Sequence, residues 1–201
     1  MTPDLQAEFR SLSEKARREL KNVPASGSHR RVFSFWAFPS FTPALRCSIY
    51  SPLPRKEVKA FAEFSIWRTD VDLEKLRSPV ERLKHPRELE PTMHGEIVWL
   101  TGEEVAEMEQ RIRGIPIPIF LAPPTWAGID GTGFEFEYNE PFYGVAIHWW
   151  EDQPSEWRPF TQTITRIVGE LDDRRKTNVQ PKALPPKKWT PVLGFERKKQ
   201  P

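Results

Sequence analysis

Proline constrains this sequence more than any other residue, with 21 prolines among 201 residues. Proline fixes one backbone torsion and has no N–H to donate, so a chain this rich in proline divides into short elements joined by ordered loops. Hydrophobic residues make up 38% of the sequence, which is enough for a packed core and argues against wholesale disorder. The length predicts one domain.

Residues 1–31 predict an amphipathic helix followed by a short linker. Apolar side chains recur every three or four positions and form one stripe, made by Leu5, Phe9, Leu12, Ala16 and Leu20. Pro3 and Asp4 suit the first turn of such a helix.

The middle of the chain changes between strand-like and helix-like patterns. Thr101 and Glu104 have the spacing of a capping box, which begins a helix. Residues 132–138 alternate aromatic and polar side chains, as a half-buried strand does. The expected strands are 32–38, 44–50, 60–67, 96–100, 132–138 and 142–150; the further helices are a short one within 71–90, one from 101 to 114 and one over 155–175; residues 115–120 are expected to be extended.

These patterns predict an α+β fold: a mainly antiparallel sheet with helices packed on one face, framed by N-terminal and C-terminal amphipathic helices.

The distribution of charged residues then divides the chain into three parts. Residues 32–173 carry 14 basic and 23 acidic side chains, whereas residues 174–201 carry nine basic side chains and one acidic one. We therefore expect an N-terminal helix and linker over 1–31, a single α+β domain over 32–173, and a basic, proline-rich tail over 174–201 that is extended and mobile.

Several classes of protein are disfavoured. The net charge of +2 excludes a uniformly basic nucleic-acid coat, and a single cysteine, Cys47, excludes a disulfide framework. The four histidines lack the spacing of zinc ligands, and no phosphate-binding or dinucleotide motif is present, so we expect no metal and no cofactor. A mean hydropathy of −0.60 and the absence of an apolar span predict no membrane contact, and with no signal-peptide pattern the cytoplasm is the expected compartment.

The most informative local feature is a stretch without lysine or arginine between Arg113 and Arg158. Like charges at this density repel unless they are solvated or neutralised by a partner. One interpretation is a solvated sheet face. The other is an acidic, aromatic-rich surface that docks a basic protein. The predicted partner-binding residues are Asp130, Glu135, Glu137, Glu140, Trp149, Trp150, Glu151 and Asp152.

Within residues 128–173, three parts follow one another: Asp130-Gly131-Thr132 entering a strand, a second strand ending in Trp149-Trp150, and Pro154-Ser155-Glu156-Trp157 opening a helix. This order resembles a segment of small bacterial proteins of unassigned function, some of which are similar to toxin-neutralising immunity proteins. The resemblance implies an α+β fold and a bacterial cytoplasmic protein, and it carries over no catalytic residue. The predicted function is a non-catalytic, immunity-type binding protein that masks a basic partner.

Two alternatives stay open. A nucleic-acid accessory protein would grip phosphates and stack a base through the tail residues Arg174, Arg175, Lys176, Lys187, Lys188 and Trp189. An enzyme would place its site near His148, with Glu151 and Asp152 beside it. The apolar residues of the tail also allow it to dock on the body as a terminal strand.

Overall fold

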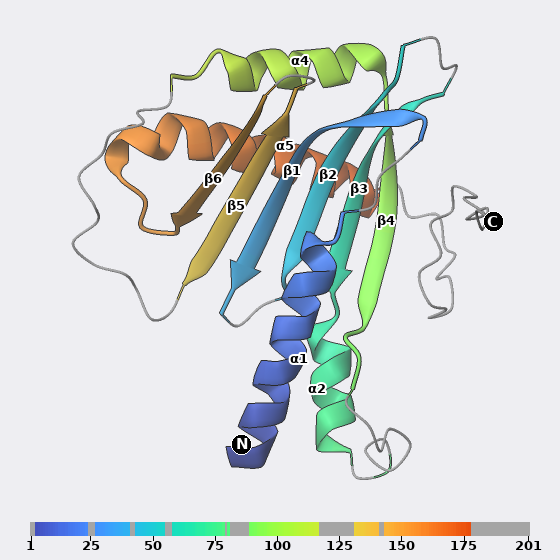
Figure 1. Ribbon diagram of the computed structural model, residues 1–201, viewed down its shortest axis with the longest axis vertical. Coiled ribbons are helices and arrows are strands. Elements are labelled where there is room, and N and C mark those ends of the chain that lie inside the picture. The colour runs from blue at the N-terminus through green and yellow to red at the C-terminus, as the bar shows by residue number, and fades with distance from the viewer. Residues whose placement is uncertain are drawn as a thin grey trace, which may run out of the picture.

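A computed structural model describes residues 3–23, 27–40, 43–54, 58–78, 80, 89–116, 131–140 and 143–177. Its centre is a six-stranded antiparallel sheet in the order β4-β3-β2-β1-β5-β6. The strands are β1 (His29–Pro39), β2 (Leu45–Pro52), β3 (Ala60–Trp67), β4 (Met93–Leu100), β5 (Thr132–Asn139) and β6 (Gly144–Trp150). The strands β1 to β4 form a meander, and the β5–β6 hairpin adds to the free side of β1 (Figure 1).

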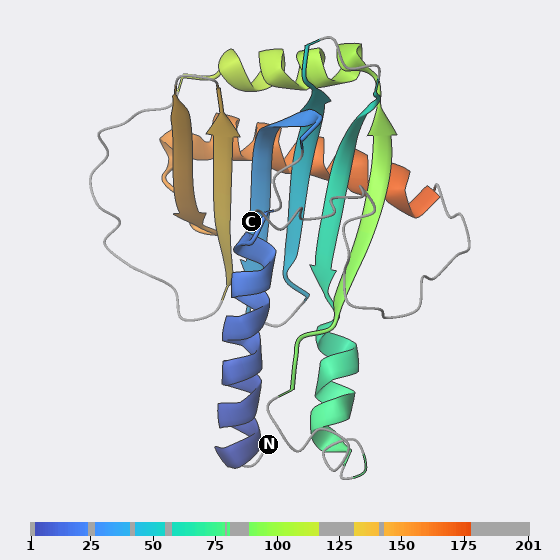
Figure 2. The same ribbon diagram turned by 45° about the vertical axis from the view of Figure 1, so that its right-hand side comes forward.

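The helices divide between the two faces of the sheet. They are α1 (Pro3–Lys21), α2 (Thr69–Arg77), α4 (Gly102–Arg113) and α5 (Arg158–Thr177), with a short 3-10 turn η1 (Ser155–Trp157) before α5. Helices α4 and α5 cover one face, which we call the α5 face. Helix α1 lies on the opposite face, the α1 face, and extends with α2 beyond the end of the strands (Figure 1; Figure 2).

The α5 face carries the larger core. Helix α5 contributes the apolar stripe that its sequence predicts: Phe160, Ile164, Ile167, Val168 and Leu171. At the β6 end of the helix, the Phe160 ring meets Phe136 and Trp149 edge-on, with ring centroids 5.3 and 6.0 Å away. At the other end, Arg175 lies over the Phe64 ring of β3. One helix therefore packs across the sheet from β6 to β3 and β4.

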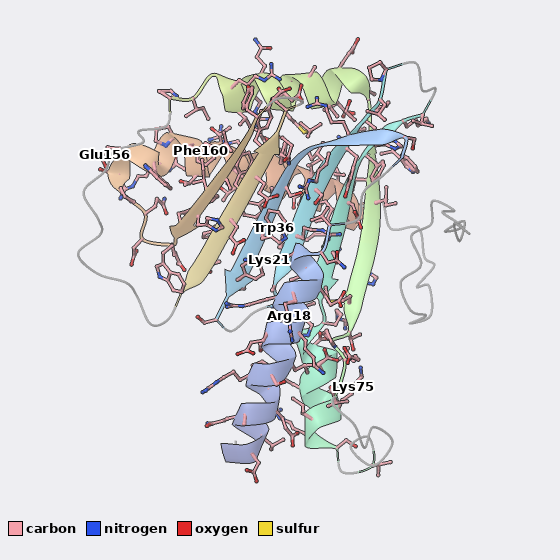
Figure 3. The ribbon with its side chains drawn as sticks, in the orientation of Figure 1. Arg18, Lys21, Trp36, Lys75, Glu156 and Phe160 are labelled. Atoms are coloured by element: carbon pink, nitrogen blue, oxygen red, sulfur yellow. The ribbon has the colours of Figure 1, made fainter. Side chains whose placement is uncertain are left out.

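The α1 face has a second core. The stripe residues Leu12, Ala16 and Leu20 are buried against aromatic side chains of the sheet, Trp36, Phe38 and Trp67. The Trp36 indole donates to the Leu20 carbonyl oxygen over 2.8 Å, which pairs the indole N–H with a carbonyl that the helix end leaves free. Figure 3 shows Trp36 next to the C-terminal end of α1, close to Lys21.

A buried ion pair lies under the same helix end. The guanidinium of Arg46, which is 2% exposed, donates to Glu63, which is 6% exposed, over 3.0 Å. It also donates to the carbonyl oxygens of Leu20 (3.3 Å) and Asn22 (3.2 Å). Burial raises the pKa of Glu63, against the opposing effect of Arg46 and of the Tyr50 hydroxyl. Arg46 thus ties β2, β3 and the end of α1 together.

The predicted α+β class, the antiparallel sheet and the two terminal amphipathic helices are confirmed. The helices do not all share one face, because α1 packs opposite α4 and α5. The physical reason is that the central strands are apolar on both faces, so Trp36 and Trp67 need a cover of their own. Strand β4 begins at Met93 rather than Glu96. Helix α5 continues to Thr177, so the first four residues of the predicted tail over 174–201 are helical. Most of the segment 115–120, and residues 178–201 of the tail, lie outside the described residues.

The helices in the described ranges include none that is long and apolar enough to cross a membrane.

Glu104 closes the capping box that the sequence predicts at the start of α4. The Glu104 amide donates to the Thr101 hydroxyl (3.1 Å), and the Glu104 carboxylate accepts from the Thr101 amide (2.7 Å) and from Arg174 (2.7 Å). The hydrogen bond from the Thr101 amide is the main cause that holds the pKa of Glu104 below its usual range.

Because folding lowers this pKa, the unfolded chain binds the proton more readily. The contribution of Glu104 to stability is therefore present above the ordinary carboxyl pKa of about 4.3 and is lost as the pH falls through the folded-state pKa. We expect Glu104→Gln to lower the free energy of unfolding at neutral pH by less than about 1 kcal/mol, and to make its decline on acidification shallower. Urea unfolding at a series of pH values checks this, and parallel acid limbs for the two proteins would contradict it.

Candidate functional site

Five of the eight predicted partner-binding residues lie on or beside one open part of the α1 face. The register of the hairpin sets Glu135 opposite His148, Glu137 opposite Ala146, and Gly133 opposite Trp150. Because side chains alternate along a strand, and Phe134, Phe136 and Tyr138 belong to the core on the α5 face, these positions are on the α1 face. We call Glu135, Glu137, His148 and Trp150 the β5–β6 face.

The carboxylates of the β5–β6 face have cationic neighbours from elsewhere in the chain. Glu135 pairs with Lys21 at the end of α1 (2.7 Å), and the His148 Nδ1 atom lies 3.7 Å from the same carboxylate. Glu137 pairs with Arg31 of β1 (3.2 Å). The stretch that lacks basic residues in sequence is therefore partly neutralised across the sheet by residues that precede it by about a hundred positions.

The rim of this face carries two more carboxylates. Glu151 is exposed and accepts a hydrogen bond from the Thr132 amide (2.9 Å), and Asp152 is exposed beside it. Neither forms an ion pair with a cation in the part of the chain that the structure describes.

The Trp150 indole lies against Gly131, where φ is +149° and an added Cβ would meet the ring at 3.0 Å. Only glycine satisfies both conditions, which explains the glycine before β5.

Other predicted residues are placed elsewhere. Trp149 is 8% exposed and packs in the core on the α5 face, so it does not belong to the β5–β6 face. Glu140 lies at the far end of β5, where it accepts from the Tyr138 hydroxyl (2.5 Å) and pairs with Arg113 and with Arg30 (3.7 Å). The hydrogen bond from Tyr138, followed by the two arginines, lowers the pKa of Glu140. Asp130 is outside the described residues.

The basic residues of the nucleic-acid alternative are engaged within the fold where they are described. Arg174 donates to Glu104 (2.7 Å) and to the Trp99 carbonyl oxygen (3.2 Å). Arg175 pairs with Glu96 (2.9 Å), and Lys176 pairs with Asp172 (2.6 Å). Lys187, Lys188 and Trp189 are outside the described residues, so the role of the tail stays a prediction.

The residues of the enzyme alternative are not joined by a contact. His148 has Glu135 as its carboxylate neighbour, rather than Glu151 or Asp152. Within the described ranges, no three histidine, cysteine or carboxylate side chains are arranged to hold a metal ion. Burial raises the pKa of the Cys47 thiol, so the thiol stays protonated. A cavity of about 110 Å³ lies between α1 and α2, lined by Leu5, Leu73, Leu76 and Arg77, away from all these groups.

Sequence reasoning missed one surface. Trp99 is 58% exposed and Ile97 is 47% exposed, and both project from β4 on the α1 face. Trp99 packs edge-on against Phe61 of β3, with ring centroids 6.0 Å apart. An exposed tryptophan beside an exposed isoleucine is typical of a contact surface. The alternation of residues 96–100 contained this signal, since Ile97 and Trp99 share a face in any strand there.

Neither the protein-family models nor the curated proteins and solved structures searched contain a significant match to this chain.

Proposed function

We propose that this chain is a non-catalytic binding protein that holds a basic protein partner against the β5–β6 face and its rim. The proposal rests on one observation: four carboxylates, Glu135, Glu137, Glu151 and Asp152, surround a sheet surface whose nearby described cations are Lys21, Arg31 and, over the adjacent Phe38 ring, Arg17. The surface therefore keeps a negative balance on a rigid strand scaffold. Such a surface steers a cationic partner and fixes its orientation.

The internal ion pairs do not oppose this role strongly. Each pair has one exposed member, Lys21 at 51% or Glu137 at 41%, and one less exposed member, Glu135 at 20% or Arg31 at 29%; pairs that water still reaches contribute only about 1 kcal/mol each. A partner with several lysines or arginines replaces these weak contacts with a larger set. Lys21 and Arg31 then compete with the partner instead of blocking it. The resemblance of residues 128–173 extends the proposal to a bacterial cytoplasmic protein of the immunity type, whose partner is a basic toxin.

A binding titration with an oligolysine peptide tests the electrostatic part of the proposal. We expect the full chain to bind the peptide with an affinity that falls as salt is added. Reversing two charges in Glu135→Lys/Glu137→Lys should weaken binding at least tenfold, which corresponds to about 1.4 kcal/mol. Both side chains lie on the open face, so the variant should keep its fold, and circular dichroism checks this.

The matched control is Glu74→Lys/Glu107→Lys, which changes the net charge by the same amount at exposed positions on α2 and α4. It should bind oligolysine almost as well as the unmodified chain. Equal affinities for the two double variants would remove the β5–β6 face from the proposal. Weaker binding by Trp99→Ala, with no effect of the charge reversals, would instead place the contact on β4.

A further inference from the structure

The two outer strands of the sheet differ in how their free edges are protected. In β4, the Arg68 amide donates to the Thr92 carbonyl, and the alternation of an antiparallel ladder then directs the backbone groups of Gly95, Ile97 and Trp99 away from β3. Arg174 donates to the outward carbonyl of Trp99, and β4 also carries the charged side chain of Glu96. This edge has the devices that discourage strand pairing.

From Gly144 to Trp149, the β6 edge has none of these devices within the described residues. Two hydrogen bonds fix its ladder, from the Glu140 amide to the Tyr143 carbonyl and from the Glu151 amide to the Thr132 carbonyl, both 2.9 Å. The residues between them alternate, so the N–H and C=O groups of Gly144, Ala146 and His148 point away from β5. The strand from Gly144 to Trp150 contains no lysine, arginine, carboxylate or proline.

Exposed apolar side chains mark the same edge. Val145 is 39% exposed and Tyr143 is 59% exposed, whereas Ile147, the next residue along the α5 face of β6, is 7% exposed. Among the outward carbonyls of β6, the one at Trp150, the last residue of the strand, has a polar neighbour within the described residues: the side-chain amide of Gln153. An uncharged edge with free backbone groups and uncovered apolar side chains is a template for another strand.

We propose that this edge pairs with β6 of a second copy of the chain, antiparallel about a two-fold axis at Ala146. Outward backbone groups must meet outward backbone groups, which sets Ala146 opposite Ala146 of the partner subunit and Gly144 opposite the partner's His148. Val145 then faces the partner's Ile147, so its exposed side chain becomes covered. On the α1 face, the residues that face each other across the axis are Ala146 with Ala146 of the partner subunit and Gly144 with the partner's His148, so no like charges oppose one another.

The axis is perpendicular to the sheet, so both copies keep α1 on the same side. The two sheets join into one, and the two β5–β6 faces become neighbours across the axis. A contact made by one edge strand falls in the size range of weak associations, so dimerisation depends on concentration. The inference does not depend on the proposed binding of a basic partner.

Sedimentation equilibrium of the full chain tests this pairing. We expect a reversible monomer–dimer equilibrium. Because position 146 faces itself, Ala146→Lys and Ala146→Glu should each place like charges across the axis and weaken dimerisation at least tenfold. An equimolar mixture of the two variants should restore the dimer, since each lysine then faces a glutamate. Ala146 is exposed, so both variants should fold, and their thermal unfolding checks this.

The control is Ile97→Lys, which adds the same charge to the opposite edge at an exposed position and should leave the equilibrium unchanged. A chain that stays monomeric at every concentration would overturn the proposal. Dimers of Ala146→Lys alone would also overturn it. Two monomeric variants whose mixture does not associate would exclude the two-fold pairing at Ala146.

Discussion

Replacing Arg46 with methionine is expected to lower the free energy of unfolding by about 3–5 kcal/mol. The change leaves the Glu63 carboxylate, only 6% exposed, without its cationic partner in a buried site. It also removes the donors to the Leu20 and Asn22 carbonyls at the end of α1. A buried charge without a partner is costly because it has lost its hydration without gaining a counter-charge. Urea unfolding followed by circular dichroism measures the loss.

The double variant Arg46→Met/Glu63→Leu separates this penalty from a loss of packing. It removes both charges together, so no carboxylate remains buried alone, and we expect it to recover a large part of the lost stability. If Arg46→Met and the double variant lose the same free energy of unfolding, the loss comes mainly from packing around Arg46 and not from the unpaired Glu63 charge. A loss below about 1 kcal/mol in the single variant would show that Glu63 is relieved, either by water or by taking up a proton.

Phe160→Ala is expected to cost about 3–5 kcal/mol, as truncation of a fully buried phenylalanine does. Phe160 is 1% exposed, and its ring contacts Phe136 and Trp149 where α5 begins to cross the sheet. The aromatic pairs are lost together with the apolar burial, and the cavity that remains is too deep in the core to collapse. Thermal and urea unfolding measure the effect.

Trp99→Ala is the matched comparison, because it truncates a larger aromatic ring that is 58% exposed. Its cost should stay below about 1 kcal/mol, from the one edge-on contact with Phe61. Similar losses for the two variants would mean that the surface of β4 is packed in solution by something that covers Trp99. A small loss for Phe160→Ala would mean that α5 does not dock as described.

The elements with a strong local signal were predictable. The stripes of α1 and α5 lie on a single helix side, and the capping box of α4 needs only Thr101 and Glu104, so neighbours in sequence decide them. The hairpin of β5 and β6 was predictable for the same reason. The face of the sheet that each helix covers was not predictable. Both sides of β1 are apolar, so the local sequence does not indicate which side α1 packs against.

The candidate site was predictable only in part. Alternation places Glu135 and Glu137 on one side of β5, and the structure confirms that arrangement. Their neutralisation by Lys21 and Arg31 depends on which strands are adjacent, and a count of charges along the chain does not contain that information. Trp149 and Trp150 are adjacent in sequence but fall on opposite faces, so only one of them belongs to the surface.

The path of α5 has a consequence for synthesis. The helix is the last element in the described chain, and it packs from β6 across to β3 and β4, so it covers strands made long before it. Until residues 158–177 leave the ribosome, α4 is the one helix among the described elements that covers the aromatic surface of β1, β3 and β5. The aromatic side chains of β1 and β3 therefore stay exposed in the nascent chain until α5 follows, and during that interval the chain is most open to aggregation and to chaperones.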